Sequence, residues 1–324
     1  MIDSNRRMWS FPWSYKESIA FVSGTIVIGF LLQLISGKFD LYLLSAPVNL
    51  IGGGIMVLLL ALFSIKRKTP FYLWFSGVPF SVTLIGAMLF MGIVMGLIPQ
   101  AVSFDPLDSN ILSKIGLRQI TSFWPFIFTY LLLLLSLGAL IVRRLINFKI
   151  GDYAFYLNHT GLWLLLFAAG LGSADTKRFV MHVQEGELEW RVYNSNGDVV
   201  ELPIAIRLND FILEEYPTSP NVDSTFCVVM TQPEPKRFVS QIDLFTEEGK
   251  EYRDIELEVN KPLRAGCWMV YQYGYDNIAG KMSTYSSLEL VYDPWLCPVY
   301  TAIILMALGA VTMFWQGVRR RKSP

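Results

Sequence analysis

Residues 153–172 read YAFYLNHTGLWLLLFAAGLG, and this stretch decides the class of fold. A run of about 20 apolar residues is long enough to cross a lipid bilayer as one helix. The only strongly polar cluster in the run is Asn158, His159 and Thr160. An ionisable side chain at membrane depth is costly, so it usually has a partner inside the protein or a functional role. His159 is therefore the first candidate functional residue.

The rest of the chain has the composition of a multi-pass membrane protein. Hydrophobic residues make up 53% of its 324 residues, and its mean hydropathy is +0.41. Six apolar runs have the length of a membrane span: 18–36, 49–65, 77–98, 123–142, 153–172 and 297–317. The first run is too long for the apolar region of a signal peptide, and no small-x-small cleavage site follows it. We therefore expect six retained transmembrane helices.

Basic residues in the short loops predict the orientation of these helices. Thirteen Lys and Arg residues flank the spans on one side of a six-span arrangement, and only three lie on the other side. The thirteen are Arg6, Arg7, Lys16, Lys66, Arg67, Lys68, Arg143, Arg144, Lys149, Arg319, Arg320, Arg321 and Lys322. Because cytoplasmic loops carry the excess of Lys and Arg, both termini are predicted to be cytoplasmic. Residues 173–296 then lie outside the cytoplasm, and the protein lies in the plasma (inner) membrane.

The predicted outer segment is acidic and has the sequence pattern of a β domain. Residues 173–296 hold 11 basic and 21 acidic residues, which argues against binding to nucleic acid or a membrane surface. A solvated acidic surface is a commoner explanation than a basic partner. Apolar and polar residues alternate at 179–183 and 188–193, and Asn196-Gly197-Asp198 fits a turn. Further strands are expected at 204–214, 225–230, 237–245, 251–259, 267–273 and 286–291.

These patterns predict an α-helical integral membrane protein with an all-β domain between its fifth and sixth helices. About eight short strands with frequent turns suggest a sandwich or a partly closed barrel. The chain divides into four regions: an N-terminal helix pair (1–76), three further spans (77–172), the β domain (173–296), and the last span with its basic tail (297–324).

Three cysteines are present, and none forms a Cys-x-x-Cys motif. Their spacing excludes a thioredoxin-type redox motif and the Cys-x-x-Cys-His site of covalent c-type haem attachment. Cys227 and Cys267 lie in the predicted outer domain, where a disulfide is permitted. The sequence leaves open whether these two residues meet.

Two histidines are the candidates for ligand chemistry. Phe155, Leu162, Trp163, Leu166 and Gly170 share a helix face with His159. This face could line a porphyrin slot, and Gly161, Gly170 and Gly172 leave room for close approach. From composition alone, a hydrogen bond from His159 to a neighbouring helix, beside Asn158 and Thr160, is the commoner explanation. His182 lies on an alternating strand, where an exposed or edge position is expected. Glu185-Gly186-Glu187 could suggest paired acids, but a turn between strands explains it as well.

Four stretches resemble the ResB/CcsB family of cytochrome c biogenesis proteins over residues 77–317. Gly96-Leu97-Ile98-Pro99-Gln100 is similar to the Gly-Thr-x-x-Pro-Gln motif that ends the family's first helix, with Leu97 in place of Thr and one residue fewer before Pro99. The second is the His159 helix from Asn158 to Gly172, and the third is Glu185-Gly186-Glu187. The fourth has two parts. Gly266 to Gln272 resembles the family's Gly-x-x-x-Tyr-Gln motif, with four residues rather than three between Gly266 and Tyr271, and Asp293-Pro294-Trp295 follows before the last helix. The 1–76 helix pair would be an addition to this family core.

The resemblance implies a subunit of a cytochrome c haem lyase complex that is not an enzyme alone. It makes His159 an axial ligand of haem iron, with haem b bound transiently and without covalent attachment. The implied partners are a ResC/CcsA-like membrane haem protein and apocytochrome c. Tyr271, Gln272, Asp293 and Pro294 belong to the signature, and structural roles are expected for them. Two other readings remain: a membrane-anchored assembly scaffold without haem contact, and a six-span transporter.

Overall fold

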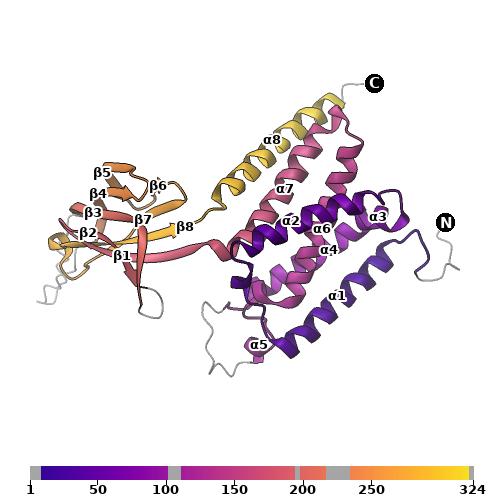
Figure 1. Cartoon of the computed structure of the whole chain (residues 1–324), viewed down its shortest axis with the longest axis horizontal. Coiled ribbons are helices and arrows are strands. Elements are labelled where there is room, and N and C mark those ends of the chain that lie inside the picture. The colour runs from indigo at the N-terminus through magenta and orange to yellow at the C-terminus, as the bar shows by residue number, and fades with distance from the viewer. Residues whose placement is uncertain (1–8, 101–110, 194–197, 217–233, 321–324) are drawn as a thin grey trace, which may run out of the picture. The chain divides into compact units, whose positions relative to one another are not determined.

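The computed structural model describes residues 9–100, 111–193, 198–216 and 234–320, apart from the side chains of residues 316–320. The chain forms two compact units (Figure 1). The helical unit comprises Met1–Asp175 and Trp295–Pro324, and the β unit comprises Thr176–Pro294. How the family core divides within the helical unit, and whether its first two helices are an addition, stay predictions.

Six long helices build the helical unit, and each coincides with one predicted span. They are α1 (Tyr15–Ser36), α2 (Val48–Ser64), α4 (Val78–Leu97), α6 (Trp124–Ile146), α7 (Tyr153–Gly172) and α8 (Leu296–Arg320). Two short helices, α3 (Pro70–Phe75) and α5 (Ile111–Lys114), lie in the connections. Among the described residues, five helices are long and apolar enough to cross a membrane, while α2 has 17 residues and is shorter. The sixth span and the orientation therefore remain predictions.

The ends of these helices follow from local sequence. Proline occupies the first turn of α3, α4 and α6, where its missing N–H is not needed. The backbone N–H of Ser14 donates to Glu17 Oε2 over 2.8 Å at the start of α1. The hydroxyl of Thr69 accepts from Tyr72 N at the start of α3. Short polar or proline-containing segments thus determine where these helices begin.

Close helix packing in this unit depends on glycine. A Cβ added at Gly29 on α1 would lie 2.8 Å from the backbone of Pro125 on α6. A Cβ added at Gly53 on α2 would lie 2.6 Å from Phe167 Cζ on α7. Small residues allow helices to approach closely in a membrane, where apolar surfaces alone give little driving force. The first two helices are thus packed directly against the helices that follow them.

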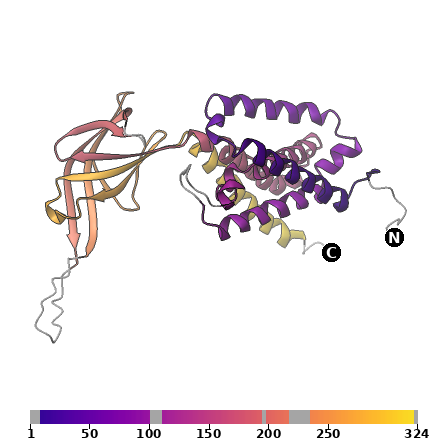
Figure 2. The same cartoon turned by 90° about the horizontal axis from the view of Figure 1, so that it is seen from below.

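Two four-stranded antiparallel sheets form the β unit, and their strands can be followed in Figure 2. One sheet has the order β1-β8-β7-β6 and the other the order β2-β3-β4-β5. The strands are β1 (Lys177–Gln184), β2 (Leu188–Tyr193), β3 (Val199–Glu215), β4 (Pro235–Thr246), β5 (Glu251–Glu258), β6 (Leu263–Ala265), β7 (Trp268–Tyr275) and β8 (Tyr285–Tyr292). Inward-facing residues of both sheets form one buried core that includes Met181, Ile206, Ile242 and Leu288. The unit is therefore a β-sandwich, one of the two expected architectures.

Most predicted strands are present at nearly their predicted bounds. β6 is an addition to the prediction, because its three residues are too few to show alternation. The strand predicted at 225–230 and the central part of the turn at 196–198 lie outside the described residues. Glu185-Gly186-Glu187 is a turn between β1 and β2, and Gly186 has φ +81°, a conformation that favours glycine.

Candidate functional site

His159 lies on α7, and its imidazole is oriented by its own helix. The Nδ1 atom lies 3.1 Å from the backbone carbonyl oxygen of Phe155. A carbonyl can only accept a hydrogen bond, so Nδ1 carries the proton when the ring is neutral. The lone pair is then on Nε2, the tautomer suited to binding a metal through that atom. Within the described part of the chain, Nε2 accepts no hydrogen bond.

Aromatic and charged groups hold this imidazole from one side. The rings of Phe155 and His159 stack with their centroids 3.9 Å apart and their planes at 27°. The guanidinium carbon of Arg144 lies 5.3 Å from the centroid of the Phe155 ring, which is cation–π range. Arg144 also pairs with Asp152 at 3.6 Å. The stack therefore ties the orientation of His159 to the connection between α6 and α7.

Other parts of the protein occupy the space beside the three glycines of α7. The room for a porphyrin predicted at these glycines is therefore smaller. A Cβ added at Gly161 would lie 2.8 Å from Met306 Cγ and 2.9 Å from the Ala302 carbonyl oxygen, both on α8. Tyr130 fills the space at Gly170, and Trp295 fills the space at Gly172. Close approach does occur at these glycines, but a helix and two aromatic side chains make it. A porphyrin beside them would have to displace these groups.

The remaining face of α7 next to His159 is more open. Trp163 turns toward α6 and donates from Nε1 to the Leu134 carbonyl oxygen over 3.0 Å. Asn158 is directed toward α8, where the backbone at Gly309 packs against it. Leu162, one turn from His159, keeps 37% of its surface exposed. The strip of Phe155, His159 and Leu162 is therefore where a flat apolar ligand could meet Nε2.

This site supplies one nitrogen ligand and no complete coordination set. Among the described residues, no group of three or more His, Cys, Asp or Glu side chains could hold a metal ion. The donor chemistry of His159 suits haem iron, which takes a neutral imidazole nitrogen as an axial ligand. A second axial ligand would have to come from another molecule. The residues present thus fit one side of a haem.

His182 is exposed on β1, an edge strand of its sheet. Its Nδ1 lies 2.7 Å from the hydroxyl of Ser287 on β8, and its ring meets Tyr285 edge-on at 5.9 Å. Sequence reasoning expected an exposed or edge histidine here, and the structure confirms that position. A cross-strand hydrogen bond explains the residue without any ligand.

Sequence analysis missed Asp175, which joins three segments at the end of α7. Its Oδ1 accepts from Ala46 N over 2.7 Å. Its Oδ2 accepts from Asn49 Nδ2 over 2.6 Å and from Trp295 Nε1 over 2.7 Å. Asn49 is fully buried and also donates to the Leu171 carbonyl oxygen. The only hint in the sequence is that Asp175 is the first acidic residue after the His159 helix.

Residues of the ResB/CcsB-like motifs that lie outside α7 form hydrogen bonds within the fold. The Gln100 side chain donates to the Ile98 and Leu117 carbonyl oxygens and accepts from Ile120 N, which fastens the end of α4 to the segment before α6.

In the β unit, Gln272 is buried in the sandwich and donates to Ser286 Oγ over 2.9 Å. Asp293 N donates to the Cys267 carbonyl oxygen over 2.9 Å. These contacts agree with the structural roles expected for Gln272 and Asp293. Cys267 is exposed, and its suggested partner Cys227 lies outside the described residues.

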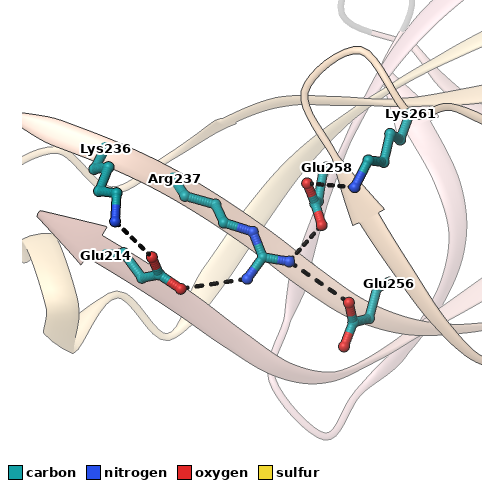
Figure 3. A network of polar contacts seen from close by, with 6 residues as sticks. All are labelled: Glu214, Lys236, Arg237, Glu256, Glu258 and Lys261. Carbon is teal, nitrogen blue, oxygen red and sulfur yellow. Dashed lines mark hydrogen bonds and ion pairs between the residues drawn. The ribbon is translucent and has the colours of Figure 1, made fainter.

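The acidic β unit also contains an ion-pair network around Arg237 (Figure 3). The Arg237 guanidinium reaches Glu214 at 3.3 Å and Glu256 at 3.6 Å, and it also pairs with Glu258. Lys261 approaches the same Glu258 carboxylate at 3.1 Å. The hydrogen bonds from Arg237 and Lys261 hold the pKa of Glu258 below its ordinary value. Part of the predicted excess of acid is thus neutralised on the surface of one sheet.

Comparison with known proteins relates part of this chain to one family. Residues 149–285 match the ResB-like family, so the predicted resemblance is confirmed over the His159 helix and most of the β unit. The Pro99-Gln100 and Asp293-Pro294 motifs lie outside the matched residues. No curated protein sequence matches the chain. A solved structure of Cytochrome c Heme Lyase CcmF aligns at 16% identity with a TM-score of 0.33, over 83% of this chain and 45% of that one. The chain therefore spans less than half the length of that protein.

Proposed function

We propose that this protein is a membrane subunit of a cytochrome c biogenesis complex, in which His159 binds haem iron while haem is passed to apocytochrome c. The ResB-like match carries the assignment to this process, because it begins just before α7 and covers the helix that bears His159. The five long apolar helices support a location in the membrane.

The tautomer of His159 is the observation that carries the ligand role. Donation from Nδ1 to the Phe155 carbonyl oxygen fixes the ring and leaves the lone pair on Nε2. A histidine kept only for helix packing would be expected to bond a neighbouring helix, whereas this ring bonds within α7. Haem, when bound, supplies the iron centre. His159 would supply one nitrogen ligand through Nε2, and the hydrogen bond from Nδ1 to the Phe155 carbonyl oxygen holds the ring in place.

A partner protein has to complete the site. The described residues offer one imidazole at this position, and in the strip of Phe155, His159 and Leu162 the first two side chains are half-buried and Leu162 is exposed. A ResC/CcsA-like membrane haem protein would cover the strip and supply the second axial ligand. His159 lies six residues after Tyr153, about 9 Å along the helix. With the predicted orientation, this depth favours haem entry from the cytoplasmic side.

Spectroscopy of the purified complex with its partner tests the proposal. His159→Ala should reduce haem content and alter the visible α-band, and added imidazole should partly restore both by occupying the vacated space. His182→Ala is the matched histidine control. It should leave the spectrum unchanged, because the His182 ring hydrogen-bonds to Ser287 within the β unit. If His159→Ala retains normal haem and supports cytochrome c maturation, His159 is not a haem ligand. The assembly-scaffold function is then favoured.

A further inference from the structure

Three consecutive basic residues form the turn between α2 and α3. Lys66, Arg67 and Lys68 follow the last turn of α2, and Thr69 and Pro70 begin α3. These five residues and Ile65 line an open depression of about 430 Å³. The turn is well fixed, since Thr69 N and Thr69 Oγ1 both donate to the Lys66 carbonyl oxygen, over 2.9 and 2.8 Å. The three cations are therefore held around a common hollow.

The charges of this turn are not used in the fold. Across the described ranges, neither Lys66, Arg67 nor Lys68 forms an ion pair, and both lysines are exposed. Arg143 at the end of α6 differs, because its guanidinium donates to the Ser76 carbonyl oxygen over 3.1 Å and the Leu73 carbonyl oxygen over 3.4 Å. Arg143 thus caps the end of α3. The three cations at the start of α3 have no acidic partner among the described residues and can bind an anion.

Aromatic and apolar side chains lie beside this turn. Phe63 at the end of α2 meets Phe71 on α3 edge-on at 6.1 Å, and Trp13 meets Phe71 at the same distance. The rings of Trp13 and Trp74 are 4.7 Å apart, and Trp74 Nε1 donates to Ser18 Oγ over 2.9 Å. Trp74 is buried, but Ile65 and Phe71 keep 69% and 38% of their surfaces exposed, and basic residues that follow an apolar span lie at the edge of the hydrocarbon layer. The hollow therefore lies where the headgroup of a lipid would be.

We propose that the Lys66-Arg67-Lys68 turn binds the phosphate of an anionic phospholipid headgroup. The open hollow admits a phosphodiester, the three cations complement its charge, and the exposed side chains of Ile65 and Phe71 offer apolar surface to the acyl chains. This site is separate from His159 and does not depend on haem. Each basic residue near a membrane surface strengthens the attraction to anionic lipid about fivefold. The ligand is a lipid rather than a free anion because only a lipid uses both the charges and the exposed apolar surface of Ile65 and Phe71.

Lipid binding to the full-length protein in neutral detergent tests this site. Native mass spectrometry and thermal unfolding are measured with phosphatidylglycerol, with phosphatidylcholine and with inorganic phosphate. Wild-type protein should retain phosphatidylglycerol in preference to phosphatidylcholine, and the preference should weaken as salt is raised. The variant K66Q/R67Q/K68Q should lose most of that preference. The control K250Q/K261Q/K281Q changes the net charge equally in the β unit, where all three lysines pair with glutamates, and should retain it.

Three results would overturn the proposal. The first is equal phosphatidylglycerol binding by the wild type and the triple variant. The second is equal binding of the two lipids by the wild type. The third is stabilisation by inorganic phosphate that phosphatidylglycerol does not reproduce, which would make the turn a site for a free anion. If the triple variant does not accumulate, K66Q/K68Q should still lower the affinity about 25-fold, and wild-type affinity in that variant would be equally decisive. K66R/K68R, which keeps the charge, should bind as the wild type does.

Discussion

The Oδ2 atom of Asp175 accepts a hydrogen bond from Trp295 Nε1 over 2.7 Å, which joins the segment after α7 to the start of α8. The same carboxylate accepts from Ala46 N and from the buried amide of Asn49 at the start of α2. One side chain thus holds three segments that are far apart in the sequence. Trp295 also covers Gly172, so the helix that carries His159 ends in a fixed position.

Replacing Asp175 with Ala should lower the unfolding temperature of the purified protein. The change leaves the buried Asn49 amide, Ala46 N and Trp295 Nε1 without this acceptor, at a cost of about 1–3 kcal/mol. Differential scanning fluorimetry in detergent measures the shift. Ser173→Ala is the control, since its exposed hydroxyl donates only to the Gly170 carbonyl oxygen. Equal unfolding temperatures for Asp175→Ala and the wild type would show that this junction contributes nothing to stability.

Gly161→Ala should destabilise the pairing of α7 with α8. The new methyl group would meet the Ala302 carbonyl oxygen at 2.9 Å, and backbone cannot move aside as a flexible side chain can. Overpacking of this kind costs about 1–3 kcal/mol. Thermal unfolding should show the loss, while Gly54→Ala on α2, which meets nothing within 4 Å, should not. A Gly161→Ala protein as stable as Gly54→Ala would contradict the close contact.

The stability of the β unit should depend on the ionisation of Glu258. Its pKa in the folded protein lies below the ordinary value of 4.5, because Arg237 and Lys261 bind the charged form. A depressed folded pKa contributes stability that is present above about pH 4.5 and is lost as the pH falls through the folded value. Amide hydrogen exchange of β4 and β5 in the full-length protein should therefore be faster in Glu258→Gln than in the wild type at neutral pH.

The difference between these two proteins should shrink as the pH is lowered below 4.5, since protonated Glu258 no longer attracts Arg237. Measuring both at each pH removes the effect of pH on intrinsic exchange. A difference that stays constant down to acid pH would show that the ion pair is not responsible.

Cysteine labelling tests the predicted orientation. Cys267 is exposed in the β unit, so it should react with a membrane-impermeant maleimide in intact cells that carry C227S/C297S. A cysteine introduced by Ser323→Cys in the triple Cys→Ser background should react only after the membrane is permeabilised. The opposite pattern would reverse the orientation deduced from the basic loops.

The secondary structure was predictable because its signals are local. An apolar run of about 20 residues forms a helix in a bilayer whatever surrounds it, since its backbone must bond within itself. The six long helices α1, α2, α4, α6, α7 and α8 therefore begin and end close to the predicted bounds. The alternation of apolar and polar residues predicted β2 with the bounds that the structure has. β6 has three residues, too few for such an alternation to be recognised. The resemblance of the His159 helix and of Glu185-Gly186-Glu187 to the ResB/CcsB family was likewise readable from the sequence.

The sequence alone therefore determined the apolar helices, the β domain and His159 as the residue to consider. Tertiary structure decided what surrounds that histidine. Helical periodicity places Gly170 on the same face of α7 as His159, but only packing shows that Tyr130 occupies the space at Gly170 and Met306 the space at Gly161. Asp175 acquires its role from Asn49 and Trp295, residues more than a hundred positions away in either direction. Contacts of this kind depend on the rotation and spacing of helices, and no local pattern encodes either.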